Sequence, residues 1–150
     1  MDEIVDSMSE QKYESKIQSI PAPVSQIFPV LSNLSNLERV KDKLPADKVT
    51  DVEISEDAIK MKVDGLGQKV VIRVVDKIEN DTVKFGFDNI PMDVNFWIQL
   101  KEVSPTDTRV KLTVKADIPM FFRMMLDKKI QQGLDDAAVM LTQFPYNQWS

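Results

Sequence analysis

The 150-residue chain contains no cysteine and no histidine. Without cysteine it can form no disulfide, no thiolate metal site and no cysteine nucleophile. Without histidine it lacks the commonest metal ligand, the base of a serine–histidine–aspartate triad and the side chain that most readily moves protons near neutral pH. An enzyme built from this chain would depend on carboxylate, lysine, tyrosine or hydroxyl side chains, or on a borrowed cofactor. We therefore predict no metal site, no resident cofactor and no catalytic residue.

Positive charge is also scarce, with 19 basic against 24 acidic side chains and a net charge of −5. Affinity for nucleic acid comes mainly from lysine and arginine on phosphates, so we predict no nucleic-acid partner. The same balance disfavours docking on anionic lipid. No apolar run approaches the roughly 20 residues of a membrane span, since Arg123 and Asp127 interrupt the most apolar stretch. We predict no stable membrane insertion.

Residues 1–10 are acidic and show no clear hydrophobic period, so we expect a flexible N-terminal segment without a signal peptide. Residues 11–150 contain no repeat, low-complexity segment or linker. We expect them to form a single domain with a sizeable core, located by default in the cytoplasm.

From residue 48 onward, short runs of alternating apolar and polar residues are separated by turn residues, which predicts an antiparallel meander. The six predicted strands span 49–54, 59–63, 68–78, 83–87, 96–100 and 110–116. Alternation at 12–20 predicts one earlier strand, with Tyr13, Ser15 and Ile17 on one face. Two short helices, at 24–31 and 34–44, are predicted between that strand and the meander, the first of them shortened by Pro29.

One long helix is predicted at 119–144, between Pro119 and Pro145. Its apolar stripe comprises Phe122, Leu126, Ile130, Leu134, Ala137 and Leu141. At about 1.5 Å per residue the helix is roughly 40 Å long, enough to cross a small sheet whose strands are about 17–20 Å long. The fold class is therefore α+β, a seven-stranded antiparallel sheet in the order β-α-α-β6-α, with this helix as its sole cover.

This element order resembles that of the START-like, or SRPBCC, superfamily, which includes Bet v 1-type allergens and bacterial polyketide cyclase/dehydrase-like proteins. The stretch IPAPV at 20–24 resembles the strand-to-helix junction of that superfamily, and TRVKLTV at 108–114 resembles its last strand. The resemblance covers residues 11–144 and implies a helix-grip fold, in which a curved sheet wraps around the C-terminal helix with an apolar cavity between them. Members bind lipids, sterols, polyketides, quinones or plant hormones, and a minority catalyse cyclisation or dehydration.

We expect the inward faces of sheet and helix to line such a cavity. The predicted ligand-binding residues of the sheet are Met61, Val63, Phe85, Phe87, Phe96, Ile98, Leu112 and Val114. Those of the helix are Phe122, Met125, Leu126, Ile130 and Gly133. For any single residue the alternative is an ordinary closed core. For Gly133, where a ligand or strand would approach closely, the alternative is simple close packing or local tolerance of glycine. The flexible methionines near the helix start, with the loops 64–67 and 89–93, predict an adaptable entrance.

Polar residues are weaker candidates for a role in catalysis or in anchoring a ligand. Asp76 and Asp117 share a phase with apolar strand positions, and a carboxylate aimed into an apolar cavity would serve as acid or base. The favoured alternative places both at strand ends near solvent. A polar anchor for a ligand is available from Tyr13, Ser15, Ser19 or Asn95. Trp97 is predicted to face outward, where with Val71 and Val75 it would form an apolar patch for a partner or a homodimer.

The leading hypothesis from the sequence is a cytoplasmic, non-enzymatic carrier or sensor of a small hydrophobic molecule, such as a lipid, fatty acid, polyketide or quinone. The first alternative is a cyclase/dehydrase-like enzyme with a carboxylate, tyrosine or lysine in the cavity. The second is a protein-interaction module that uses the patch around Trp97.

Overall fold

The computed structural model describes residues 10–43 and 49–149 of the chain. The strands are β1 (Glu10–Glu14), β2 (Gln18–Ile20), β3 (Val49–Ile54), β4 (Ala58–Val63), β5 (Val70–Ile78), β6 (Thr82–Asp88), β7 (Val94–Ser104) and β8 (Asp107–Asp117). The α-helices are α2 (Val24–Leu31), α3 (Met120–Leu141) and α4 (Tyr146–Trp149), and two 3₁₀ helices are η1 (Leu34–Arg39) and η2 (Lys41–Lys43).

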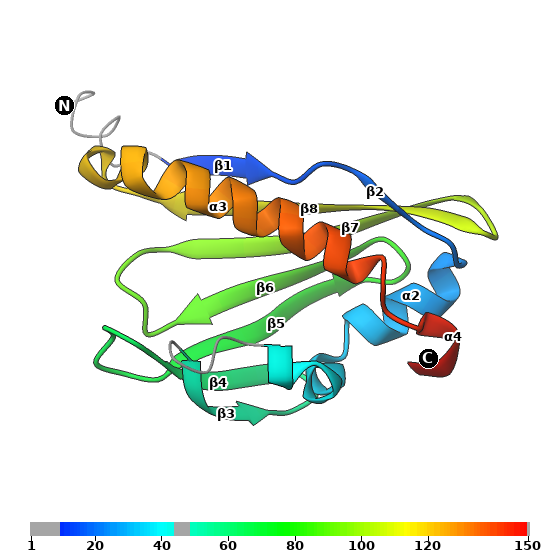
Figure 1. Ribbon diagram of the computed structural model, residues 1–150, viewed down its shortest axis with the longest axis horizontal. Coiled ribbons are helices and arrows are strands. Elements are labelled where there is room, and N and C mark those ends of the chain that lie inside the picture. Colours follow the sequence, from blue (N-terminus) through cyan, green and yellow to red (C-terminus); the bar gives the residue numbers. More distant parts are fainter. Residues whose placement is uncertain (1–9, 44–48, 150) are drawn as a thin grey trace.

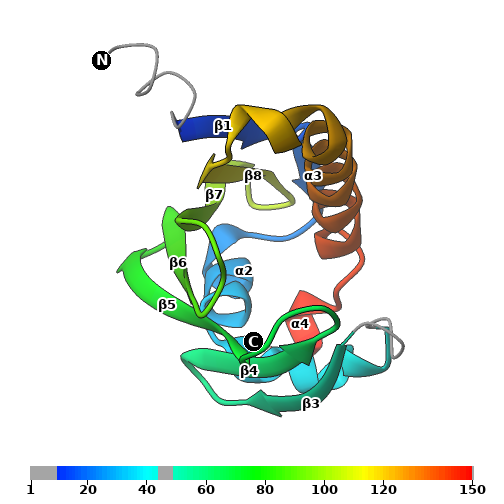
Figure 2. The same ribbon diagram turned by 90° about the vertical axis from the view of Figure 1, so that its left-hand side faces the viewer.

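The strands form one antiparallel sheet in the order β1-β8-β7-β6-β5-β4-β3, with β2 also paired to β8. Figure 2 shows that the sheet curves strongly, so that β3 and β4 turn back beneath α3. In Figure 1 α3 runs along the sheet beside β1 and β8, and α4 lies toward the opposite end of the molecule from the start of β1. This architecture confirms the predicted α+β class and the helix over a curved sheet.

The predicted strand at 12–20 is split in two. Glu14 pairs with Thr113 and Gln18 with Val110, so three residues of this segment lie opposite two of β8. The backbone N–H of Leu112 bonds to the hydroxyl of Ser15 at 2.9 Å, which fills the broken position in the ladder. Because the extra residue reverses the alternation, Ile17 is exposed and the later Ile20 is fully buried. The prediction that Ile17 shares a face with Tyr13 is wrong for this reason.

The prediction that α3 alone covers the sheet is also wrong. Helix α2 carries the buried side chains Ile27, Phe28, Val30 and Leu31, and η1 adds Leu34. A carboxylate at the far end of β7 fixes α2 in place, since Glu102 Oε1 accepts a 2.9 Å bond from the N–H of Val24 at the helix start. The second predicted helix is two short 3₁₀ turns rather than one α-helix, and its expected end near residue 44 lies outside the described residues.

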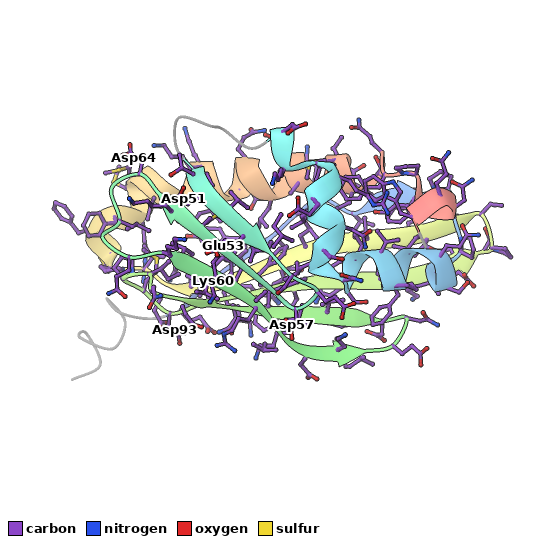
Figure 3. The ribbon with its side chains drawn as sticks, turned by 90° about the horizontal axis from the view of Figure 1, so that it is seen from below. Asp51, Glu53, Asp57, Lys60, Asp64 and Asp93 are labelled. Atoms are coloured by element: carbon purple, nitrogen blue, oxygen red, sulfur yellow. The ribbon has the colours of Figure 1, made fainter. Side chains whose placement is uncertain are left out.

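Strand β3 forms one edge of the sheet, at the opposite end of the strand order from β1. A bulge interrupts its pairing with β4 between Thr50 and Glu53, and Asp51 adopts a φ of +53° there. Figure 3 looks onto the outer face of these strands, where Asp51, Glu53 and Lys60 are labelled. Glu53 also forms a 2.9 Å ion pair with Lys69. Charge and the bulge both disfavour addition of a further strand at this edge.

Candidate functional site

Two adjoining apolar chambers lie between α3, the short helices and the sheet. The larger has a volume of about 240 Å³ and the smaller about 210 Å³. They share Leu37, Ile59, Ile72 and Met140 as lining residues, so they form one divided space. Together they fall within the roughly 300–1,000 Å³ that small-molecule sites usually have.

The larger chamber is lined from three directions. The short helices supply Val30, Leu31, Asn33, Leu34, Asn36 and Leu37; the sheet supplies Ile59, Ile72, Phe85, Phe87, Phe96, Ile98 and Leu112; and the C-terminal region supplies Ala137, Met140, Leu141 and Phe144. Phe85 and Phe96 stack with their ring centroids 5.4 Å apart. None of these described lining residues carries a carboxylate, an amine or a phenol, so the chamber offers aromatic and aliphatic contacts without formal charge.

The two polar side chains of this lining are engaged in their own turn. Asn33 Oδ1 accepts bonds from the N–H of Ser35 at 3.0 Å and from its hydroxyl at 2.5 Å. Asn36 Nδ2 donates to the carbonyls of Val30 at 3.1 Å and Asn33 at 3.2 Å. These bonds stabilise the tight 3₁₀ turn at 34–39, and they engage Asn33 Oδ1 and Asn36 Nδ2 within the turn rather than toward the chamber.

The smaller chamber extends beneath the edge of the sheet. Its further lining residues are Val40, Lys41, Val52, Ile54 and Met61. Lys41 is its single ionisable side chain among the described lining residues, and it forms a 3.3 Å ion pair with Glu38 on the helix surface. Glu38, three residues earlier in the chain, therefore holds the ammonium group of Lys41 at the rim of the chamber.

The C-terminal segment closes the chamber wall. Phe144 lies against Trp149 with ring centroids 4.9 Å apart, and the guanidinium of Arg39 lies 5.1 Å from the centroid of Trp149. The hydroxyl of Tyr146 donates a 2.5 Å bond to the carbonyl of Leu141, the last residue of α3. Burial raises the pKa of Tyr146. Residues 144–149 thus pack against Arg39 of η1 and the end of α3, and Trp149 supports Phe144 in the chamber wall.

Five of the predicted ligand-binding residues come together in the larger chamber: Phe85, Phe87, Phe96, Ile98 and Leu112. Met61 lines the smaller one. Val63 and Val114 are half-buried on the sheet and line neither chamber. The alternation of apolar residues in β6, β7 and β8 is the signal that identified the five.

The helix residues predicted for the site are placed elsewhere. Leu126 and Ile130 are half-buried, whereas Phe122 and Met125 are 44% and 58% exposed, and no side chain lies within 4 Å of where a Cβ on Gly133 would point. None of the five predicted helix residues lines either chamber. The chambers lie instead along the C-terminal half of α3, at Ala137, Met140 and Leu141.

The predicted entrance is likewise not at the chambers. The loops 64–67 and 89–93 and the start of α3 lie together at one end of the molecule, at the left in Figure 1, and α2 and α4 lie toward the other. No residue of these loops lines either chamber.

The polar candidates do not form a site. Asp76 is exposed because a bulge after Val74 shifts the pairing of β5, and Asp117 pairs at the sheet edge with Glu10. Tyr13 donates its hydroxyl to Asp127 of α3, and burial, reinforced by this bond, raises the pKa of Tyr13 to about 12. Ser15 is used in the strand break described above; Ser19 is exposed, and neither it nor Asn95 lines a chamber.

Trp97 does face the outer side of the sheet, but it is half-buried there. The ammonium groups of Lys84 and Lys115 lie 5.4 and 5.7 Å from its ring centroid. Val71 is half-buried too, whereas Val75 is 42% exposed. With two cations close to the Trp97 ring, this part of the outer face is mixed in character rather than wholly apolar.

Lining residues that sequence reasoning missed come from the short helices and the chain end, namely Val30, Leu31, Leu34, Leu37, Met140 and Phe144. Their apolar spacing was visible, but only the tertiary docking of α2 and η1 onto the sheet turns them toward a common space.

No protein-family model matches the chain, and no curated protein matches it. Solved structures, in contrast, do match the chain. Norcoclaurine synthase from Thalictrum flavum, in complex with dopamine and hydroxybenzaldehyde, is similar with a TM-score of 0.68 and 12% identity, over 92% of this chain and 87% of that one. Ara h 8.0201 is similar with a TM-score of 0.55 and 17% identity, over 87% of this chain and 95% of that one. The chain has the Bet v 1-like fold.

A protein from Thermobifida fusca is a further structural neighbour of this Bet v 1-like chain, with a TM-score of 0.64 and 13% identity over 93% of this chain and 95% of that one. These likenesses confirm the helix-grip resemblance, and at such identities they concern the fold alone. Within the described residues, no helix is long and apolar enough to cross a membrane. The same part of the chain contains no cluster of three acidic side chains that could hold a metal ion.

Proposed function

We propose that the protein binds one small, uncharged, mainly apolar molecule in the two chambers. The observation that carries the proposal is the divided apolar space itself, enclosed by α3, the short helices and the sheet. The lipid, fatty-acid, polyketide and quinone classes expected from the sequence remain inside this proposal, because a mainly apolar lining accepts each of them through its hydrocarbon part.

Empty apolar space is informative because protein interiors are normally packed to crystal-like density. A ligand that fills the larger chamber would be stabilised by the apolar surface that it buries there, at about 25 cal/mol per Å².

One structural neighbour supports a small aromatic ligand. Norcoclaurine synthase holds dopamine and hydroxybenzaldehyde on the same fold. Here the rings of Phe85 and Phe96 stack against each other, and Phe87 also lines the larger chamber. An aromatic ring in the ligand that contacts these rings would gain about 0.5–1.5 kcal/mol beyond its area burial.

An enzymatic role for the chambers is not favoured by their lining. A cyclase/dehydrase-like reaction needs an acid or base within hydrogen-bond reach of the ligand. Lys41 is the single described candidate, and it is paired with Glu38 at the rim of the smaller chamber. We therefore propose binding rather than catalysis.

A cavity-filling variant tests the proposal. Ala137 lines the larger chamber from α3, so Ala137→Phe would occupy part of the space. Val139→Phe is the matched control, because Val139 is 42% exposed on the same helix and lines neither chamber. Binding is measured by fluorescence titration with the neutral probe N-phenylnaphthylamine, and co-purified ligand is sought by native mass spectrometry.

Loss of about 80 Å² of ligand burial corresponds to about 2 kcal/mol, or roughly 30-fold in affinity. We expect this loss in Ala137→Phe and unchanged binding in Val139→Phe. A wild-type protein that neither binds the probe nor carries a co-purified molecule would contradict the proposal. Equal probe affinity in Ala137→Phe and wild type would contradict it as well.

A further inference from the structure

The first two turns of α3 expose large apolar side chains on the side away from the sheet. Met120, Phe121, Met124 and Met125 are 56%, 87%, 92% and 58% exposed. We call these four residues the outward stripe. Single exposed apolar residues are ordinary, but four large ones on two consecutive helical turns are not.

The outward stripe is a separate surface from the one that α3 buries. At about 100° per residue, its four members span an arc of about 140° around the helix axis. The half-buried side chains of Leu126 and Ile130 lie on the opposite side of the axis. The start of α3 is thus apolar on both faces, and an arc of this width matches the face that one packed helix presents to another.

We propose that a second copy of this chain covers the outward stripe, through a two-fold contact in which the same stripe of each copy packs against the other. A two-fold contact needs only one self-complementary surface, and a helix face paired with its own copy provides it. The flexible methionines suit such a contact, because they adapt their shape to a neighbour.

The area of the outward stripe is sufficient for this contact. If each large side chain carries about 200 Å², the exposed fractions correspond to roughly 590 Å² per copy. Complete burial of both stripes would remove roughly 1,200 Å² from water, against the approximately 1,000 Å² expected of a specific interface. An interface made of methionine and phenylalanine also has the apolar character typical of homodimers.

Charge favours a second copy over a lipid surface. Residues 119–126 contain no carboxylate, and their one ionisable side chain, Arg123, is directed back toward the end of β8, where its Nε donates a 3.4 Å bond to the carbonyl of Ile118. Each whole chain carries −5, which opposes approach to an anionic bilayer. Between two copies this long-range repulsion is screened by salt, so added salt strengthens the dimer, whereas it would weaken an interface held by ion pairs.

Sedimentation velocity of the full chain, from micromolar to near-millimolar concentration and at low and moderate salt, tests the proposal. The variant is Phe121→Ser combined with Met124→Ser, and the control is Val139→Ser, an exposed apolar position on the same helix outside the stripe. Both changes lie at exposed positions and introduce no charge, and circular dichroism checks that each variant keeps its fold.

We expect a concentration-dependent dimer for the wild type and the control, tightened by salt, and a dimer at least about tenfold weaker for the double variant. A wild type that stays monomeric at every concentration would overturn the proposal. So would a double variant that dimerises as tightly as the wild type, or a monomer that cosediments with phosphatidylcholine vesicles through the stripe.

Discussion

The two tyrosines of the chain allow one hydrogen bond to be isolated by a minimal change. The hydroxyl of Tyr146 donates a 2.5 Å bond to the carbonyl of Leu141 at the end of α3. In a continuing helix that carbonyl would receive an N–H from four residues later, but residue 145 is proline and has none. Tyr146→Phe therefore removes the hydroxyl that serves this carbonyl and keeps the ring.

The expected cost follows from burial. Tyr146 is only 3% exposed, so water cannot easily replace the lost hydroxyl, and a buried polar group left without a partner costs about 1–3 kcal/mol. For a chain of 150 residues, each kcal/mol corresponds to about 2–4 °C in melting temperature. We expect Tyr146→Phe to lower the free energy of unfolding by about 2 kcal/mol.

Tyr13→Phe is the matched comparison, because it removes the same atom from the other tyrosine. Its acceptor, Asp127, is exposed and can be rehydrated, so we expect a smaller loss, about 0.5–1.5 kcal/mol. Urea unfolding followed by circular dichroism measures both variants. If Tyr13→Phe costs as much as Tyr146→Phe, or if Tyr146→Phe is neutral, the account of the end of α3 is incorrect.

Two further predictions concern α3 and its neighbour β1. Gly133→Ala should raise the free energy of unfolding by about 0.5–1 kcal/mol, because glycine is costly within a helix and no side chain lies within 4 Å of the added methyl group. Urea unfolding measures this change. A destabilised variant would reveal a close contact at this position. Tyr13 should form its phenolate only near pH 12, against about 10 when unfolded, so its contribution to stability is complete below pH 10 and is lost as the pH rises to 12. Asp127→Asn should lower the pKa of Tyr13 but leave it above 10, because burial is the larger cause of the shift. Ultraviolet titration of the phenolate, in a Tyr146→Phe background so that Tyr13 is the single tyrosine, measures both values. An ordinary pKa for Tyr13 with Asp127 intact would contradict this account.

Much of the sheet was predictable from the chain because its signal is local. In β6 and β7 the alternation of Val83, Phe85, Phe96 and Ile98 identifies the inward face without knowledge of the partner strand. The same local rule identified five of the residues that line the larger chamber. That these residues hold a ligand remains a prediction.

The position of the chambers along α3 was not predictable in this way. The apolar period of the helix continues through Phe122 and Leu126, yet the helix start is largely exposed, and period alone does not show where coverage ends. The contributions of Leu34 and Phe144 depend on docking between segments more than 100 residues apart in the sequence. Such packing is decided by tertiary contacts rather than by local pattern.

The strand breaks have a consequence for how this chain is aligned with others. The segment between Glu14 and Gln18 contains one residue more than its partner strand, and so does β5 at Val75. A relative without either bulge would be one residue shorter at each place. An alignment without gaps there would match inward positions of one chain with outward positions of the other. At 12–17% identity, an alignment of this chain with these solved structures therefore has to allow a one-residue gap at each of the two places.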